Sequence, residues 1–153
     1  MAQAGVVEGV IGAGIDHGLH LLAEALDGQD QATDVLERLS ANSRGRLSTQ
    51  VLGEVFRVLT TKRRPAVPSV DAVTRLEALA HTWPIYVVTP AIVLEAARGV
   101  RDYRMKYWDA QLWATARLNQ IPTILTEDAP GATLEGIRYV NPFAAAFDPA
   151  SLS

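Results

Sequence analysis

A set of acidic residues stands at positions from which the side chains could bind a divalent cation together: Asp16, Glu54, Asp109 and Asp128. Each has an ordinary explanation when it is taken alone: a helix cap, an ion pair with Arg57, an acid favoured by a helix dipole, or a turn residue. Converging carboxylates repel one another unless a cation lies between them, and their hard oxygens suit Mg²⁺ or Mn²⁺. Such an ion can activate a water for phosphodiester hydrolysis.

The segments around these acids alternate between apolar strand candidates and helical patterns. Strands are predicted over residues 6–15, 46–47, 84–88, 121–126 and 137–140. Helices are predicted over residues 19–26, 32–39 and 49–61, after a cap at Ser69, over 90–99, and over 103–118, the longest. Thr89-Pro90 is expected to start the helix over 90–99, and Gly99 to end it. Strands that alternate with helices predict a parallel α/β sheet covered on both faces.

In an open parallel sheet, ligands bind beyond the carboxyl ends of the strands. Asp16 follows the first predicted strand, and Glu127 and Asp128 follow the strand over 121–126. Glu54 lies in a helix capped by Ser48 or Thr49, with valines at helical spacing around it. Asp109 is a lone acid among large aromatic and aliphatic side chains. Their convergence is therefore plausible on topology, although spacing alone does not establish it.

The composition bounds the class of protein. The chain has 153 residues, 48% hydrophobic and 20% charged, which suits one globular domain over residues 1–153. It has no cysteine, which excludes a disulfide scaffold and a thiolate metal site and fits a reducing cytoplasm. We expect no membrane span, because no apolar run approaches about 20 residues. The net charge is -3, so a nucleic acid would need a local basic patch.

Two basic clusters provide candidates for that patch. One is the loop Lys62-Arg63-Arg64, and the other comprises Arg98, Arg101, Arg104 and Lys106 near Asp109. Tyr103, Tyr107 and Trp108 could stack on bases, whereas Trp113 is expected in the core. His17 and His20, spaced i,i+3, leave open a transition-metal site with Asp16. Gly12-Ala13-Gly14 lacks the third glycine of a dinucleotide-binding turn.

Four segments in this order resemble the PIN-domain family, in particular the VapC-like ribonuclease toxins of type II toxin–antitoxin pairs. They are residues 47–54 (LSTQVLGE), 107–110 (YWDA), 124–128 (ILTED) and 140–143 (VNPF). The resemblance spans residues 25–143. It implies a three-layer α/β/α fold with a central parallel sheet.

The resemblance also implies a function and its residues. Asp16, Glu54, Asp109 and Asp128 would hold Mg²⁺ or Mn²⁺, with Thr126 and Glu127 in support, for endonucleolytic cleavage of RNA. Arg101, Arg104 and Lys106 would bind the RNA. Family members are neutralised by a small antitoxin protein and form homodimers, so both interactions are implied here.

The amino terminus departs from the family pattern. Where the family has Asp-Thr-Asn or Asp-Ser-Asn, this chain reads Asp16-His17-Gly18, with Asp27 as a second candidate for the first acid. A PIN-fold module that binds RNA or antitoxin without turnover is therefore an alternative. A third hypothesis is an unrelated α/β hydrolase of small phosphoesters that uses the same acids.

Overall fold

The computed structural model describes residues 9–11, 30–126 and 133–152. Its strands form a five-stranded sheet in the order β3-β2-β1-β4-β5, and every neighbouring pair is parallel. They are β1 (Gly9–Ile11), β2 (Gly45–Ser48), β3 (Ile85–Tyr86), β4 (Thr123–Leu125) and β5 (Arg138–Val140). The predicted parallel α/β sheet is confirmed. β2 is longer than the predicted strand over 46–47, and the other four strands are shorter than predicted. The remainder of the predicted strand over residues 6–15 lies outside the described residues.

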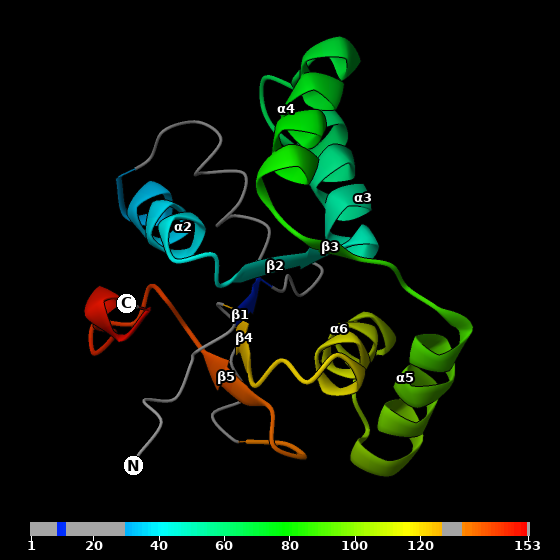
Figure 1. The fold of residues 1–153 in the computed structure, drawn as a ribbon. Helices are drawn as coiled ribbons and strands as arrows, with labels where there is room; N and C mark the ends of the chain where they lie inside the picture. Colours follow the sequence, from blue (N-terminus) through cyan, green and yellow to red (C-terminus); the bar gives the residue numbers. More distant parts are fainter. Residues whose placement is uncertain (1–8, 12–29, 127–132, 153) are drawn as a thin grey trace.

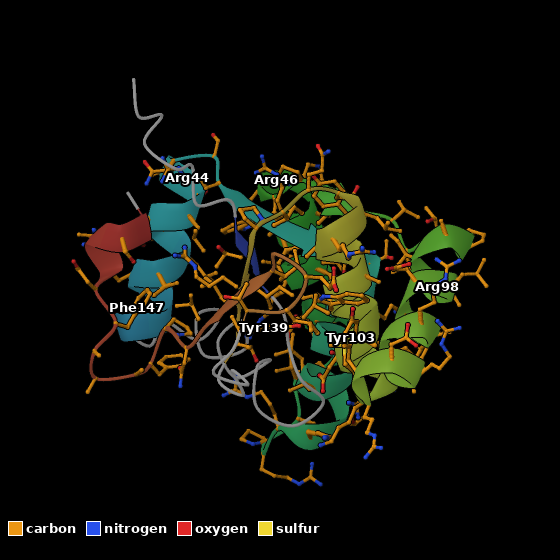
Figure 2. All side chains as sticks on the ribbon, turned by 90° about the horizontal axis from the view of Figure 1, so that it is seen from below. Arg44, Arg46, Arg98, Tyr103, Tyr139 and Phe147 are labelled. Carbon is orange, nitrogen blue, oxygen red and sulfur yellow. The ribbon has the colours of Figure 1, made fainter. Side chains whose placement is uncertain are left out.

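Helices cover both faces of the sheet. Figures 1 and 2 place α2 on one side of the sheet, and α6 with α5 on the other. The helices are α2 (Asp30–Ala41), α3 (Thr49–Arg57), α4 (Ser69–Thr82), α5 (Pro90–Tyr103) and α6 (Tyr107–Leu118). Two short turns, η1 (Val58–Lys62, π-helical) and η2 (Pro149–Leu152, 3₁₀), complete the described elements. Within the described ranges, no helix combines the length and apolarity needed to cross a bilayer.

Helix α3 follows β2 without a linker, and its start agrees with the sequence prediction. The Ser48 hydroxyl accepts a hydrogen bond from the Val51 backbone N–H at 3.3 Å, which satisfies one of the free donors at the helix start. Val51, Val55 and Leu59 recur every four residues and are fully buried. The α-helix gives way at Val58 to the π-helical turn η1, so the predicted single helix over 49–61 is divided. The opposite face of α3 points away from the core.

The predicted boundary between α5 and α6 was wrong. Gly99 was expected to end the helix, but α5 continues through it to Tyr103, where Arg104 adopts a left-handed conformation with φ of 56°. Gly99 serves close packing instead, because a Cβ there would lie 3.0 Å from the Trp113 ring. The predicted helix over 103–118 therefore begins only at Tyr107, and α4 and α5 are both longer than it.

Helix α6 is an interior helix, and every residue from 110 to 116 is buried. Trp113, only 1% exposed, packs edge-on against Tyr103 with ring centroids 5.7 Å apart. Arg117 lies 5.5 Å from the centroid of the Trp113 ring and also hydrogen-bonds the buried Glu95 of α5. These contacts fix α6 against α5. The predicted core position of Trp113 is confirmed.

The start of α4 differs from its prediction by one residue. Ser69 was expected to cap this helix, but Ser69 is its first residue and Pro68 occupies the cap position without a side-chain hydrogen bond. By contrast, the predicted Thr89-Pro90 start of α5 is confirmed. The Thr89 hydroxyl accepts from the Ile92 N–H at 3.3 Å, and proline occupies the first turn.

Gly45, at the start of β2, provides a test of this packing. A Cβ at Gly45 would lie 1.2 Å from Cζ3 of Trp83, a residue that is only 6% exposed. We expect Gly45→Ala to lower the free energy of unfolding by about 1–3 kcal/mol, measured by urea denaturation. The control is Gly53→Ala in α3, where a Cβ meets nothing within 4 Å and a gain of about 0.5–1 kcal/mol is expected. Equal effects of the two substitutions would contradict this packing.

Candidate active site

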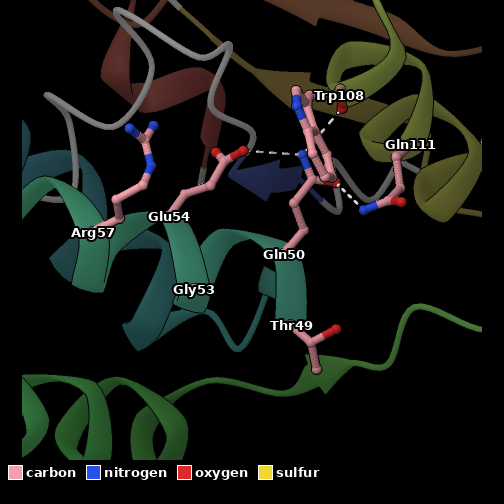
Figure 3. Close-up of a pocket in the computed structure, with 7 residues that line it drawn as sticks. All are labelled: Thr49, Gln50, Gly53, Glu54, Arg57, Trp108 and Gln111. Atoms are coloured by element: carbon pink, nitrogen blue, oxygen red, sulfur yellow. Dashed lines mark hydrogen bonds between the residues drawn. The ribbon is translucent and has the colours of Figure 1, made fainter.

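A pocket of about 480 Å³ lies between α3 and the first turns of α6. It is lined by Thr49, Gln50, Gly53, Glu54, Arg57, Trp108 and Gln111. Figure 3 shows that Gln50, Glu54 and Arg57 project from the same face of α3, as their spacing along the helix requires. The face of α3 that the core does not use is thus the floor of the pocket.

Glu54 is a half-buried carboxylate with one oxygen unsatisfied. Its Oε1 accepts a hydrogen bond from Gln50 Nε2 at 3.4 Å. Its Oε2 is buried and has no hydrogen-bond partner among the described residues. Burial raises the pKa of Glu54 above its ordinary value, and the negative charge of Asp109 adds to this rise, while Gln50 and Arg57 oppose it. The ionised form is therefore incompletely compensated by the described side chains.

Asp109 is the second predicted acid within the described residues, and its negative charge affects groups around Glu54. It lies in the first turn of α6, where the helix dipole favours a negative charge. Its charge raises the pKa of both Glu54 and Tyr139, which belong to α3 and β5. The structure therefore brings Glu54 and Asp109 into electrostatic contact, although 55 positions of sequence numbering separate them.

Thr126 was predicted as the last residue of a strand and directly follows β4, which ends at Leu125. Thr126 is buried. Its backbone N–H donates to the Val140 carbonyl at 2.9 Å, which joins the end of β4 to the end of β5. Glu127 and Asp128 come next in the chain and lie outside the described residues. The structure thus describes the end of β4, directly before these two acids in the sequence.

A chain of hydrogen bonds links α6 to Glu54. The Tyr107 hydroxyl donates to Gln111 Oε1 at 3.0 Å, and Gln111 Nε2 donates to Gln50 Oε1 at 2.8 Å. Because Gln50 Oε1 is thereby an acceptor, its Nε2 must face the other way. Gln50 Nε2 donates to the Trp108 carbonyl at 3.1 Å as well as to Glu54. The order of donors therefore fixes which end of the Gln50 amide meets the carboxylate.

Tyr139 of β5 adds a buried phenol to the region. Its hydroxyl has no hydrogen-bond partner among the described residues. Burial, reinforced by the charge of Asp109, raises the pKa of Tyr139 to about 12. The group therefore stays protonated at neutral pH and remains a hydrogen-bond donor next to an acidic site.

The oxygen ligands of the pocket fit a divalent cation. Glu54 and Asp109 supply carboxylates, and Glu54 Oε2 is buried without a partner among the described residues, which suits a hard cation such as Mg²⁺ or Mn²⁺. No cluster of three or more histidine or acidic side chains able to hold a metal occurs within residues 9–11, 30–126 and 133–152. Several predicted candidates lie outside these ranges: Asp16, His17, His20, Asp27, Glu127 and Asp128.

The predicted RNA-binding residues were expected around the start of the long helix, and they lie at the junction between α5 and α6. Arg101 lies in the last turn of α5 and is 71% exposed, with its guanidinium 2.6 Å from Asp102. Arg104 and Lys106 lie in the junction before α6, and both are exposed. Both precede the first turn of α6, which carries Asp109. The ion pair with Asp102 offsets part of the positive charge of this group.

Some residues of the site were missed by the sequence analysis. Gln50 stands four residues before Glu54 on the same helical face, so the spacing alone could have identified it as a neighbour. Gln111 and Tyr139 carry no comparable signal, because each reaches the site only through the packing of α6 and β5.

Comparisons with known proteins give a consistent result. Residues 20–130 match the family described as the PIN domain. A toxin–antitoxin complex from Klebsiella pneumoniae superposes with a TM-score of 0.62 and 21% identity, over 82% of this chain and 94% of that chain. VapBC2 from Rickettsia felis, bound to promoter DNA, superposes with a TM-score of 0.62 and 14% identity, over 87% of this chain and 97% of that chain. VapC20 from Mycobacterium tuberculosis, a toxin that cleaves the sarcin-ricin loop, superposes with a TM-score of 0.55 and 18% identity, over 82% of this chain and 92% of that chain. No curated protein sequence matches the chain.

The raised pKa of Glu54 predicts a particular dependence of stability on pH. A carboxyl group whose pKa is raised by folding favours the folded state below its unfolded pKa, and this contribution is lost as the pH rises through the folded pKa. In EDTA, Glu54→Gln should therefore be more stable than the wild type at pH 7. The difference should shrink as the pH falls through the raised pKa of Glu54 and stay constant below the unfolded pKa of about 4.3.

Urea denaturation at a series of pH values measures this difference. Glu77→Gln, at an exposed position on α4, is the matched control and should show no comparable gain. A Glu54→Gln variant that is less stable than the wild type at pH 7 would show that burial does not dominate the energetics of Glu54.

Proposed function

This chain belongs to the PIN-domain family, and from that premise we propose that it is a metal-dependent endoribonuclease, the toxin of a type II toxin–antitoxin pair. The observation that carries the proposal is the pairing of Glu54 with Asp109 beside a pocket at the carboxyl side of a parallel sheet. Parallel sheets place their chemistry at that edge, and paired acids that repel one another favour a divalent cation.

The metal ligands proposed are Glu54 and Asp109 together with Asp16 and Asp128. The unsatisfied Oε2 of Glu54 is a ready donor for such an ion. When bound, Mg²⁺ or Mn²⁺ supplies Lewis-acid stabilisation of phosphate oxygens and lowers the pKa of water. Thr126 and Glu127 are proposed to support the ligands from the end of β4.

The chain's own residues have separate tasks in this proposal. Gln50 holds the Glu54 carboxylate in one orientation, because its amide is itself fixed by Gln111. Arg57 supplies a positive charge on the pocket floor, where an anionic backbone would approach. Arg101, Arg104 and Lys106 are proposed to hold more distant phosphates, with an affinity that falls as salt rises.

The choice of substrate and partner rests on similarity. VapC20, which shares the fold, cleaves an RNA loop, and two other matching structures are of toxins with their antitoxins. We therefore assign RNA as the substrate and a small antitoxin protein as the partner, and we expect the chain to form a homodimer.

A second candidate function is a PIN-fold module that binds RNA or antitoxin without turnover. The observation that favours it is the sequence Asp16-His17-Gly18 in place of the Asp-Thr-Asn or Asp-Ser-Asn that the family pattern leads one to expect. Loss of one ligand would weaken the hold on a metal without disturbing Glu54 and Asp109.

Cleavage of a mixed RNA pool by the purified chain distinguishes these functions. We expect cleavage with Mg²⁺ or Mn²⁺, none with EDTA, and a loss of at least about 100-fold in Asp109→Asn, since even residues that only hydrogen-bond to metal ligands contribute about 10- to 100-fold. Asp71→Asn is the control, because Asp71 is a first-turn acid of α4 as Asp109 is of α6.

The outcomes separate clearly. Cleavage that survives both EDTA and Asp109→Asn would refute the metal-dependent nuclease. No cleavage by a folded chain that binds RNA or antitoxin would select the binding module. Turnover of a nucleoside monophosphate with intact RNA left untouched would select a small-phosphoester hydrolase.

A further inference from the structure

Trp108 is the one tryptophan of the three that the structure leaves open to solvent. Its side chain is 44% exposed, whereas Trp83 and Trp113 are 6% and 1% exposed. It lines the pocket rather than the core, and Tyr107 packs edge-on against it with ring centroids 5.2 Å apart. A large aromatic ring held in place at the wall of a pocket is a surface on which a flat ligand can stack.

The position of Trp108 is coupled to that of Glu54 through a single amide. Gln50 Nε2 donates both to the Trp108 carbonyl at 3.1 Å and to Glu54 Oε1 at 3.4 Å. Figure 3 shows the Gln50 side chain between the indole and the carboxylate. A ligand stacked on Trp108 is therefore adjacent to the acidic residues and not at a remote surface.

Arg57 supplies the complementary charge. It lies one helical turn beyond Glu54 on the same face of α3, so the carboxylate stands between the indole and the guanidinium (Figure 3). Arginine pairs with phosphate oxygens through two parallel N–H donors. Gly53 adds no side chain to the floor between them, and a Cβ there would meet nothing within 4 Å.

We propose that this pocket is a subsite for one unpaired nucleotide of RNA, with the base stacked on Trp108 and a flanking phosphate held by Arg57. The inference rests on the proposed function for its substrate class and adds a subsite that positions one nucleotide beside the acids. The pocket volume of about 480 Å³ falls within the range of roughly 300–1,000 Å³ typical of small-ligand sites. Because every base has a π-face, stacking on Trp108 selects an unpaired nucleotide and tolerates different bases.

The test is a double-substitution cycle between protein and RNA. Binding of a fluorescently labelled single-stranded hexanucleotide is measured in EDTA, with the wild-type chain and with Trp108→Ala. A second set of hexanucleotides carries one abasic position, moved through the sequence. We expect Trp108→Ala to weaken binding of the intact RNA by about 5- to 150-fold, the usual contribution of one stacked base.

The cycle identifies the base that contacts Trp108. At one position, the abasic RNA should bind the wild type as weakly as intact RNA binds Trp108→Ala, and combining the two changes should weaken binding no further. Trp108→Phe should retain most of the affinity. Independent losses that multiply at every position, or no loss in Trp108→Ala, would overturn the proposal.

Matched variants control for folding and charge. Leu118→Ala removes an exposed apolar side chain at the far end of α6 and should leave binding unchanged. The plot of log affinity against log salt has a negative slope. Arg57→Gln should reduce the magnitude of this slope by about 0.7, the value for one phosphate contact on a single strand, whereas Arg75→Gln on α4 should not. An unchanged slope in Arg57→Gln would refute the phosphate contact.

Binding in EDTA needs no turnover, so this test is independent of catalysis. A chain that shows the cycle but never cleaves RNA retains the nucleotide subsite and loses the nuclease assignment. A chain that cleaves RNA but shows no coupling between Trp108 and any base retains the nuclease assignment and loses the subsite.

Discussion

The burial of the Glu54 carboxylate, to which the negative charge of Asp109 adds, is the constraint to which the rest of the site responds. Both carboxylates are only partly exposed, and burial raises the pKa of Glu54 before any effect of its neighbours. Gln50 and Arg57 offset part of this cost, but one oxygen of Glu54 stays buried without a described partner. A fold that keeps such a pair together is less stable than it would be with neutral side chains, unless a cation joins them.

The scaffold holds this arrangement by fixing two helices independently. Helix α3 is anchored directly to the sheet through the Ser48 cap and a stripe of buried valines and leucine. Helix α6 is anchored by its burial between the sheet and α5, where Trp113 fits against Gly99 and Arg117 joins Glu95. The amides of Gln50 and Gln111 then set the spacing between the helices. The acids and the exposed ring of Trp108 therefore share a rigid frame.

How much of this the sequence predicts depends on the range of the interaction. Most local signals were reliable: Ser48 and Thr89 cap their helices, and the alternation of strands and helices predicted the parallel sheet. The predicted cap at Ser69 was wrong by one residue. Gly99 misled because its role is to admit Trp113 from another helix, which local propensity cannot reveal. The link between Gln50 and Gln111 is likewise tertiary. The acids Asp16 and Asp128 lie outside the described residues, so their place in the site stays a prediction.

Thermal unfolding in a Mn²⁺ titration tests most directly whether Glu54 and Asp109 bind a divalent cation together. Stabilisation by a ligand specific for the folded state reaches about 2.7 kcal/mol at one hundred times its Kd. The Tm of the wild type and of the control Asp71→Asn should rise with Mn²⁺, while Asp109→Asn and Glu54→Gln should show little or no rise. An equal rise in all four proteins, or none in the wild type, would contradict a shared metal site.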